Sequence, residues 1–444
     1  MKKIKESIFN IYTETNNHKL LFNSLYCGLC EIDENYFSTL SKIKSGKESL
    51  LTDEEKKILE LGTEAGFFVN DNFDELNYFR ILKYKSKFSE ESLTITIAPT
   101  LSCNFQCTYC YEDSKYNENI MSESVINKLA QYLNSISTRL QKLNIVWYGG
   151  EPLLAKKAIY TLSDKLITIC QKNKIEYNAM MVTNGSLLKE SDIELLKKYM
   201  IQEIQITLDG PPRIHNLRRY CSSIPDNFNL IIDNINMLLD SEISVIIRIN
   251  VDRTNFSSIE ELLQYLSNTL HTKNVYIGFA KVSACTDACS SVAKDCFSSE
   301  EFSKKYFDLY DLIVKYGFDK STPLPYAQPK LNYCGADVYN AFVIDPSGFI
   351  YKCWHDVGNK ALAIGTVDNV EYALSSPYCE KWLFKDALRS VDCCNCSVLP
   401  LCGGGCPSEN FYNNRISYCD EIKYNISEII IKNYYNQLKK GDAL

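Results

Sequence analysis

The sequence predicts an α/β protein: a partial (β/α)6 barrel with a winged-helix-like module before it and a loop-rich domain after it. Three observations support this. Six strand-like segments alternate with segments of helical period between residues 92 and 316. The first 90 residues follow a different order of strands and helices. The last third has few periodic runs and many Cys and Gly. We therefore expect three domains, at residues 1–90, 91–320 and 321–444.

The N-terminal module is predicted from alternating strands and one capped helix. In chain order we expect strands over 7–15 and 19–32 with a polar turn at 16–18, a helix from Thr52 to about Gly66, and a strand over 67–70 before another helix. Thr52 and Glu55 form the capping-box pattern that begins the first helix. Acidic stretches such as 71–75 disfavour DNA binding by this module.

The barrel prediction rests on repeated strand–helix units. The expected strands cover 93–99, 144–148, 176–182, 203–208, 244–250 and 274–280. Successive units of this kind form a parallel sheet with right-handed crossovers, here most simply all or part of a TIM-like barrel. Functional loops of such a barrel lie at the carboxyl ends of its strands. The last third is expected to end in a Tyr-rich helix from Asp420 to about Lys440.

Composition excludes several classes of partner. The chain has 444 residues, 45% of them hydrophobic and 23% charged, which is typical of a globular protein. A net charge of −7 disfavours nucleic acid and anionic membranes as partners. The N-terminal lysines precede no apolar run, and no stretch reaches the roughly 18 apolar residues that span a bilayer. We expect a cytoplasmic protein.

Nineteen cysteines are the compositional anomaly. A reducing cytoplasm keeps thiols free and favours metal ligation over disulfides. Cys103, Cys107 and Cys110 form a C-x3-C-x2-C loop directly after the first barrel strand. Three thiolates can hold three irons of a [4Fe–4S] cube and leave the fourth iron open. A structural zinc loop is the alternative, but zinc normally takes four ligands in paired spacing.

This loop resembles the signature of the radical S-adenosylmethionine (SAM) superfamily. The resemblance implies that the triplet cluster cleaves SAM to a 5′-deoxyadenosyl radical, which abstracts a substrate hydrogen. It also implies that Tyr109 lies beside the adenine, Glu151 accepts from the SAM amino group, and Arg219 pairs with the SAM carboxylate. The rest of the implied SAM-binding set is Gly149, Gly150, Thr183, Asn184, Thr207, Asp209, Arg248 and Asn250. Ordinary turn chemistry is the alternative for several of them.

The remaining cysteine pattern resembles the SPASM extension of radical SAM enzymes. The array consists of Cys334, Cys353, Cys393, Cys396, Cys402, Cys406 and Cys419. The resemblance implies two auxiliary [4Fe–4S] clusters, one on Cys334, Cys353 and Cys406, the other on Cys393, Cys396, Cys402 and Cys419. Three [4Fe–4S] clusters and SAM are therefore the expected cofactors. The first auxiliary set lacks a fourth ligand, which is either substrate or one of Cys285, Cys289, Cys296, Cys379 and Cys394. Zinc ribbons are the alternative reading of the array.

SPASM enzymes mostly act on peptides, and the N-terminal module resembles leader-peptide recognition elements, which add the leader as an edge strand. The resemblance implies a peptide maturase whose partners are a precursor peptide and an electron donor such as ferredoxin or flavodoxin. The three-cysteine set suggests an intrapeptide thioether as the product. Carbon–carbon cross-linking and epimerisation stay open.

Two other functions fit part of this pattern. An anaerobic sulfatase-maturating enzyme shares the same core and clusters, but that family places an acidic residue directly after the second array cysteine. Here that position is Trp354, followed by His355 and Asp356. A non-catalytic iron–sulfur electron carrier or scaffold is disfavoured because it needs no SAM site, such as the one that 149–152 implies. Cys27, Cys30, Cys170 and Cys221 are interpreted as structural.

Overall fold

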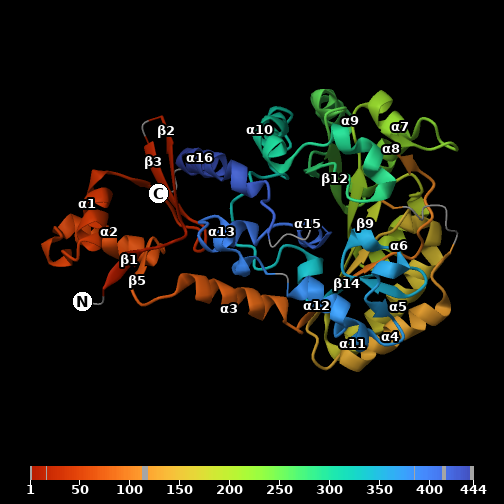
Figure 1. The fold of residues 1–444 in the computed structure, drawn as a ribbon. Coiled ribbons are helices and arrows are strands. Elements are labelled where there is room, and N and C mark those ends of the chain that lie inside the picture. The colour runs from red at the N-terminus through yellow and green to blue at the C-terminus, as the bar shows by residue number, and fades with distance from the viewer. Residues whose placement is uncertain (1–2, 17, 113–118, 385, 413–416, 441–444) are drawn as a thin grey trace. The chain divides into compact units, whose positions relative to one another are not determined.

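The computed structural model describes residues 3–16, 18–112, 119–384, 386–412 and 417–440 (Figure 1). The chain forms two compact units. Unit 1 comprises residues 1–88, 324–337 and 384–444, and unit 2 comprises 89–323 and 338–383. The three-domain division stays a prediction. Asn17 of the expected N-terminal turn lies outside the described residues.

Unit 2 contains a nine-stranded sheet in the order β13-β12-β10-β9-β8-β6-β14-β15-β16. The six strands expected for the barrel are confirmed as β6 Ser92–Ile97, β8 Lys142–Trp147, β9 Glu176–Thr183, β10 Ile201–Thr207, β12 Ser244–Val251 and β13 Tyr276–Lys281. Neighbours among them pair in parallel. Among the described strands β13 pairs only with β12, so the sheet ends there and the barrel is partial.

Amphipathic helices connect these strands. They are α4 Glu123–Ile136, α5 Lys156–Asn173, α6 Ile193–Lys198, α7 Pro212–Arg218, α8 Asn227–Asp240, α9 Ile259–Thr269 and α10 Ser299–Lys315. In α4 the Ser122 side chain caps the first turn by accepting from the Val125 N–H, and Val125, Leu129 and Leu133 are buried at helical spacing. Helix α4 thus begins at a capping serine and packs one apolar face against the rest of unit 2.

The sheet continues into the cysteine-rich part of the chain, which the sequence did not predict. β14 Ala341–Ile344 pairs in parallel with β6, and β15 Phe349–Tyr351 and β16 Gly365–Thr366 follow in antiparallel order. All four residues of β14 are buried. A short, wholly apolar run gives no period from which a strand can be recognised. Helices α11 Val370–Leu374 and α12 Pro377–Leu383 complete this unit.

The N-terminal part of unit 1 has two small sheets and three helices. β2 Asn10–Thr15, β3 His18–Asn23 and β4 Leu29–Ile32 form one antiparallel sheet, and β1 Ile4–Glu6 pairs with β5 Phe68–Asn70. The helices are α1 Glu34–Lys44, α2 Asp53–Glu64 and α3 Glu75–Lys87. The expected capping box of Thr52 and Glu55 begins α2. The expectation of one strand over 19–32 is wrong, because a turn with Cys27 at φ 62° divides it.

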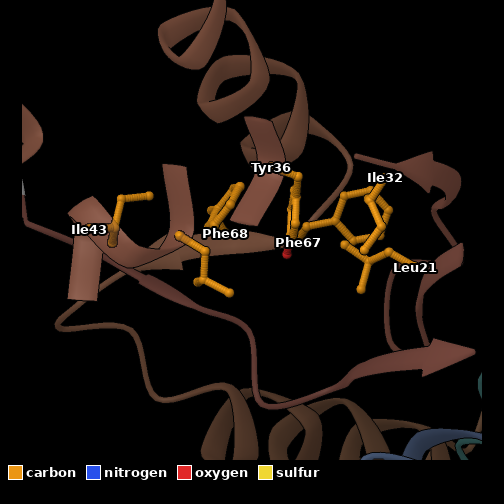
Figure 2. Packing of buried hydrophobic residues seen from close by; sticks show 7 residues of the cluster. Leu21, Ile32, Tyr36, Ile43, Phe67 and Phe68 are labelled. Carbon is orange, nitrogen blue, oxygen red and sulfur yellow. The ribbon is translucent and has the colours of Figure 1, made fainter. Parts of the chain in front are cut away.

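A hydrophobic cluster joins these elements (Figure 2). Leu21 of β3 and Ile32 of β4 belong to the same buried cluster as Tyr36 of α1 and Phe68 of β5. The sheet and the helices therefore share one core. A winged-helix identity for this part of the chain stays a prediction.

The C-terminal part of unit 1 shares its core with the N-terminal part. It contains α13 Val391–Cys394, α14 Leu399–Cys402, α15 Pro407–Tyr412 and α16 Ile422–Lys440, which confirms the expected terminal helix. Phe79 of α3 is fully buried against Leu388 and Leu399. Tyr434 of α16 donates a 2.7 Å hydrogen bond to Glu31 of β4. No helix among the described residues is long and apolar enough to cross a membrane.

Candidate active site

The cysteine triplet lies on the loop after β6, which is hydrogen-bonded to the segment that contains Arg218 and Arg219. β7 Gln106–Cys107 pairs with β11 Arg219–Tyr220, and Cys107 stands opposite Arg219. The Thr108 N–H donates to the Arg218 carbonyl at 2.9 Å. The Phe105 N–H donates to Cys103 Sγ at 3.4 Å. Backbone donation of this kind stabilises a thiolate and suits a cluster ligand.

Gly149 and Gly150 follow β8 and press against the same loop. A Cβ at Gly149 would lie 2.3 Å from the Thr100 carbonyl oxygen, and one at Gly150 would lie 2.3 Å from that of Ser102. The Glu151 N–H donates to the Ser102 carbonyl at 2.8 Å. The glycines are needed first for this close packing of two backbone segments, which places Glu151 beside the cysteine loop.

Glu151 is fully buried and almost fully bonded. Its Oε1 accepts from the Leu153 N–H at 3.0 Å and from Thr183 Oγ1 at 2.7 Å, and its Oε2 accepts from the Asn184 N–H at 2.8 Å. Burial raises the pKa of Glu151, while these hydrogen bonds and Arg219 oppose the increase. Since a carboxylate offers about four acceptor positions, roughly one remains for a ligand ammonium.

Asn184 links the end of β9 to the cysteine loop. Its side-chain amide donates to Asn104 Oδ1 at 2.8 Å, and Asn104 donates to Ser186 Oγ at 3.0 Å. Asn104 stands between the first two cysteines of the triplet. Asn104 was not predicted as a site residue, since nothing in the local sequence shows that its partner lies 80 residues away.

Tyr109, Asp209, Arg219 and Asn250 meet in one hydrogen-bonded group. Tyr109 donates to Asp209, and its hydroxyl accepts from Arg219 Nη1 at 2.8 Å and from Asn250 Nδ2 at 3.2 Å. Burial raises the pKa of Asp209, and Arg219 and Arg218 oppose the increase. Arg219 Nε is buried and has no acceptor among the described residues. A buried guanidinium donor without a partner fits a ligand carboxylate.

Arg218 and Asp252 hold this group in place, and neither was predicted from the sequence. Arg218 Nη1 contacts Asp252 Oδ1 at 3.0 Å and Oδ2 at 2.8 Å, and its Nε lies 3.7 Å from Asp209. His215 is fully buried and accepts from the Asp209 N–H at 3.3 Å. Burial lowers the pKa of His215. A neutral His215 therefore supports the loop of Asp209.

Thr207 and Arg248 lie on adjacent strands. They face each other in the β10–β12 ladder, and Arg248 Nε donates to Asn250 Oδ1 at 2.9 Å. Aromatic side chains gather nearby. The Tyr148 ring centroid lies 4.4 Å from that of Trp354, and Tyr111 packs edge-on against His355 at 4.8 Å. The Tyr111 and Tyr148 hydroxyls are hydrogen-bonded.

Six array cysteines lie in unit 1 and fall into two groups. The charges of Cys393 and Cys396 raise the pKa of both Cys402 and Cys419, after the larger effect of burial, so these four thiols are electrostatic neighbours. Burial raises the pKa of Cys334, and the charge of Cys406 raises it further, so these two thiols are also electrostatic neighbours. The Gly404 N–H donates to Cys402 Sγ at 3.3 Å, and Lys423 Nζ lies 3.1 Å from Cys396 Sγ. Donors aimed at sulfur suit iron–sulfur ligands.

Cys353 belongs to unit 2. Burial raises the pKa of Tyr148 there, and the charges of Cys110, Cys353 and Cys285 raise it further. In the described ranges no group of three or more His, Cys, Asp or Glu side chains is arranged to hold a single metal ion. The ligand sets of the three clusters therefore stay predictions. Of the possible fourth ligands, Cys289 is fully buried and its Sγ contacts the Thr286 carbonyl at 3.4 Å, and Cys394 Sγ contacts the Leu388 carbonyl at 3.2 Å.

Residues 97–266 match the model of the radical SAM superfamily. The chain therefore contains a radical SAM domain. The match begins at the last residue of β6, runs through the cysteine loop and the segments that contain Glu151, Arg219 and Asn250, and ends within α9. Membership implies SAM and a [4Fe–4S] cluster as cofactors. The free acceptor position of Glu151 and the free donor of Arg219 fit the ammonium and carboxylate of the methionyl part of SAM.

Two relatives of the enzyme cover most of its length. The radical SAM cyclopropyl synthase TigE of Paramaledivibacter caminithermalis is 24% identical, with 97% of this chain and 96% of TigE matched. A cysteine-type anaerobic sulfatase-maturating enzyme of Clostridium novyi is 25% identical over 75% of this chain and 94% of its own. The sporulation killing factor maturation protein SkfB of Bacillus subtilis is 25% identical over 40% of each chain.

Solved structures share the fold of the enzyme. Native anSMEcpe with bound AdoMet superposes with a TM-score of 0.60 and 18% identity, covering 78% of this chain and 98% of that one. SuiB of Streptococcus suis bound to precursor peptide SuiA gives a TM-score of 0.55 and 16% identity, covering 94% and 98%. The α/β fold with a partial radical SAM barrel, predicted from the sequence, is confirmed.

Proposed function

We propose that the enzyme is a peptide maturase that acts on a ribosomally made precursor. The observation that carries this proposal is an open sheet edge in unit 1, in a chain whose unit 2 is a radical SAM enzyme. Relatives named for peptide chemistry support it: SuiB was solved with a precursor peptide, and SkfB is a maturation protein. An electron donor such as ferredoxin or flavodoxin would supply the reducing electron.

The open edge belongs to β4. Among the described strands β4 pairs only with β3. The Asn23 N–H donates to the Gly28 carbonyl at 2.9 Å, and the register sets Phe22 against Leu29 and Leu20 against Glu31. Because hydrogen-bonded and non-bonded pairs alternate in an antiparallel ladder, the backbone groups of Leu29 and Glu31 point away from β3. An extended leader peptide could bond to these groups as a fourth strand.

Replacing Leu29 with Pro should weaken leader binding strongly while SAM cleavage persists. Proline removes one outward N–H but leaves the β3–β4 ladder intact, and the preceding Gly28 tolerates the restriction that proline imposes. Fluorescence anisotropy with a labelled leader peptide measures the affinity. Leu29→Val keeps the N–H and is the matched control. Equal affinity of Leu29→Pro and the wild type would contradict leader binding at this edge.

At the proposed SAM site the side chains of the protein would bind SAM and orient it. Glu151 would accept from the SAM ammonium, and Arg219 Nε would donate to its carboxylate. Tyr109 would lie beside the adenine, held by Asp209, Arg219 and Asn250. When bound, the cluster and SAM supply a 5′-deoxyadenosyl radical that removes a hydrogen atom from the peptide. The buried ring of Tyr148, which packs on the half-buried ring of Trp354, would exclude water and competing hydrogen donors.

We propose further that the product is an intrapeptide thioether. The predicted set of Cys334, Cys353 and Cys406 leaves a ligand position that a substrate cysteine can fill as a thiolate, the form that binds metal. Overall, one C–H and one S–H bond break and one C–S bond forms. The reaction would balance if the radical took the carbon hydrogen, the sulfur proton passed to solvent, and an auxiliary cluster held by the array cysteines accepted the remaining electron.

Carbon–carbon ring closure is the second candidate, because TigE, which matches nearly the whole chain, is a cyclopropyl synthase. Sulfatase maturation is the third, because the Clostridium novyi relative matches three quarters of this chain. Trp354 occupies the position where the sequence analysis expects the acidic residue of that family. Asp356 is buried two residues further on. An electron carrier or scaffold would bind no SAM.

Mass spectrometry of a precursor peptide coexpressed with the enzyme tests the product. A thioether should make the peptide lighter by one H2, protect its cysteine from alkylation, and disappear when the peptide cysteines become serine. The same mass loss in a cysteine-free peptide would favour carbon–carbon closure, and an unchanged mass with inverted stereochemistry would favour epimerisation. Conversion of a sulfatase-derived peptide alone would favour sulfatase maturation.

A further inference from the structure

Two buried lysines of α3 share one aspartate within unit 1. Lys87 Nζ lies 2.5 Å from Asp337 Oδ1, and Lys83 Nζ lies 3.1 Å from Asp337 Oδ2. The side chains of Lys83 and Lys87 are 3% and 0% exposed, and that of Asp337 is 7% exposed. Lys83 and Lys87 are called the lysine pair, and the two lysines with Asp337 are called the trio. With both lysines charged, the trio carries a net charge of +1.

The lysine pair lies among the cysteine-bearing loops of unit 1. Lys83 Nζ also reaches the carbonyl oxygens of Leu331 at 3.2 Å and Gly403 at 3.4 Å. Leu331 precedes Cys334 by three residues, and Gly403 directly follows Cys402. The Asp337 N–H donates to the Cys334 carbonyl at 3.0 Å. The same lysine thus contacts loops that the array assigns to both auxiliary clusters.

A net buried cation beside these loops needs a physical reason. Burying a charge is costly unless an opposite charge lies nearby, and one lysine would have sufficed to neutralise Asp337. Both Cys334 and Cys402 become negative when they ligate iron. A positive charge in a medium of low dielectric favours the more negative, reduced state of a neighbouring cluster.

We propose that the charges of Lys83 and Lys87 raise the reduction potentials of the two auxiliary iron–sulfur clusters, the one assigned to the Cys334 loop and the one assigned to the Cys402 loop. The inference rests on the auxiliary clusters of the proposed function. A centre of higher potential accepts an electron more readily, as closure of a cross-link requires. Asp337 acts in the opposite direction, and the balance of the three charges sets the potential.

Redox titration followed by electron paramagnetic resonance tests the proposal on the reconstituted full-length enzyme. Lys87→Met reduces the charge of the trio to zero and leaves Asp337 bonded to Lys83, so the auxiliary potential should fall. Asp337→Asn increases the charge to +2, so the potential should rise. The double variant restores +1 and should return close to the wild type, as should Lys87→Arg.

Lys85→Met is the matched control, because Lys85 is an exposed lysine of the same helix and solvent screens its charge. Its potential should equal that of the wild type. If the lysines are only structural, Lys87→Met and Asp337→Asn should shift the auxiliary reduction potential in the same direction or not at all. Either result would overturn the inference without contradicting the presence of the clusters. Iron for one cluster per chain would overturn both the inference and the auxiliary-cluster assignment.

Discussion

An enzyme in which Cys103, Cys107 and Cys110 are all alanine is expected to lose SAM cleavage completely. The wild type should contain about twelve irons if three cubane clusters form, and the variant about eight. The triplet loop belongs to unit 2, whereas the predicted ligands Cys393, Cys396, Cys402 and Cys419 all belong to unit 1. Loss of the triplet should therefore spare that set. Anaerobic chromatography of 5′-deoxyadenosine and iron analysis measure the two outcomes.

Cys170→Ala is the control for the triplet variant. Cys170 is buried on α5 and belongs to none of the three predicted ligand sets. Its iron content and SAM turnover should match those of the wild type. Unchanged SAM turnover in the triplet variant would falsify the catalytic assignment of the loop.

Deletion of residues 1–90 is expected to unfold unit 1 and to empty the auxiliary sites. The sequence alone suggests a removable module whose loss leaves the array intact. The structure revises this expectation, because Phe79 of α3 packs on Leu388 and Leu399 and the lysine pair neutralises Asp337. Losing the buried Phe side chain costs about 3–5 kcal/mol, and leaving a buried carboxylate unpaired costs a similar amount. Together these losses are comparable with the stability of a whole domain.

Iron content and thermal unfolding of the truncated chain measure this outcome. Leu29→Pro in the full-length chain is the matched comparison, since it alters the proposed leader edge and keeps α3. It should retain all its iron, whereas the truncated chain should lose the auxiliary share. A truncated chain that keeps about eight auxiliary irons and unfolds in one cooperative transition would show that α3 is dispensable.

The barrel could be predicted because its strands follow a strong local pattern. All six expected strands exist, each within a few residues of its expected bounds. Two elements without such a pattern were missed, because β1 Ile4–Glu6 has three residues and β14 has no polar alternation. Helix α1 Glu34–Lys44 was also missed, although Asp33 caps it and Tyr36, Leu40 and Ile43 are buried at helical spacing. The strand expected over 19–32 is divided at Cys27, which lies in the left-handed region, and Asn23, Ser24 and Gly28 are the polar and turn residues that mark this break in the sequence.

The predicted site residues were found by spacing and resemblance, and their supporting partners were not. Tyr109, Asp209, Arg219 and Asn250 were named separately, and the structure joins them through one hydroxyl. Asn104, Arg218, Asp252 and the lysine pair escaped notice because their partners are remote in sequence. Lys83 and Asp337, for example, are separated by 254 residues. Nothing local distinguishes such a lysine from an exposed one.

The short ladder that sets Cys107 opposite Arg219 makes iron retention and SAM affinity a linked equilibrium. A ligand that holds Arg219 in place also restricts the conformations of the cysteine loop, so bound SAM should increase the affinity of the loop for iron. Thermodynamic reciprocity then requires bound iron to increase the affinity for SAM by the same factor. The metal-free protein should thus bind SAM more weakly than the contacts of SAM alone suggest. Saturating SAM should slow the removal of iron by a chelator, so that SAM stabilises the cluster that cleaves it.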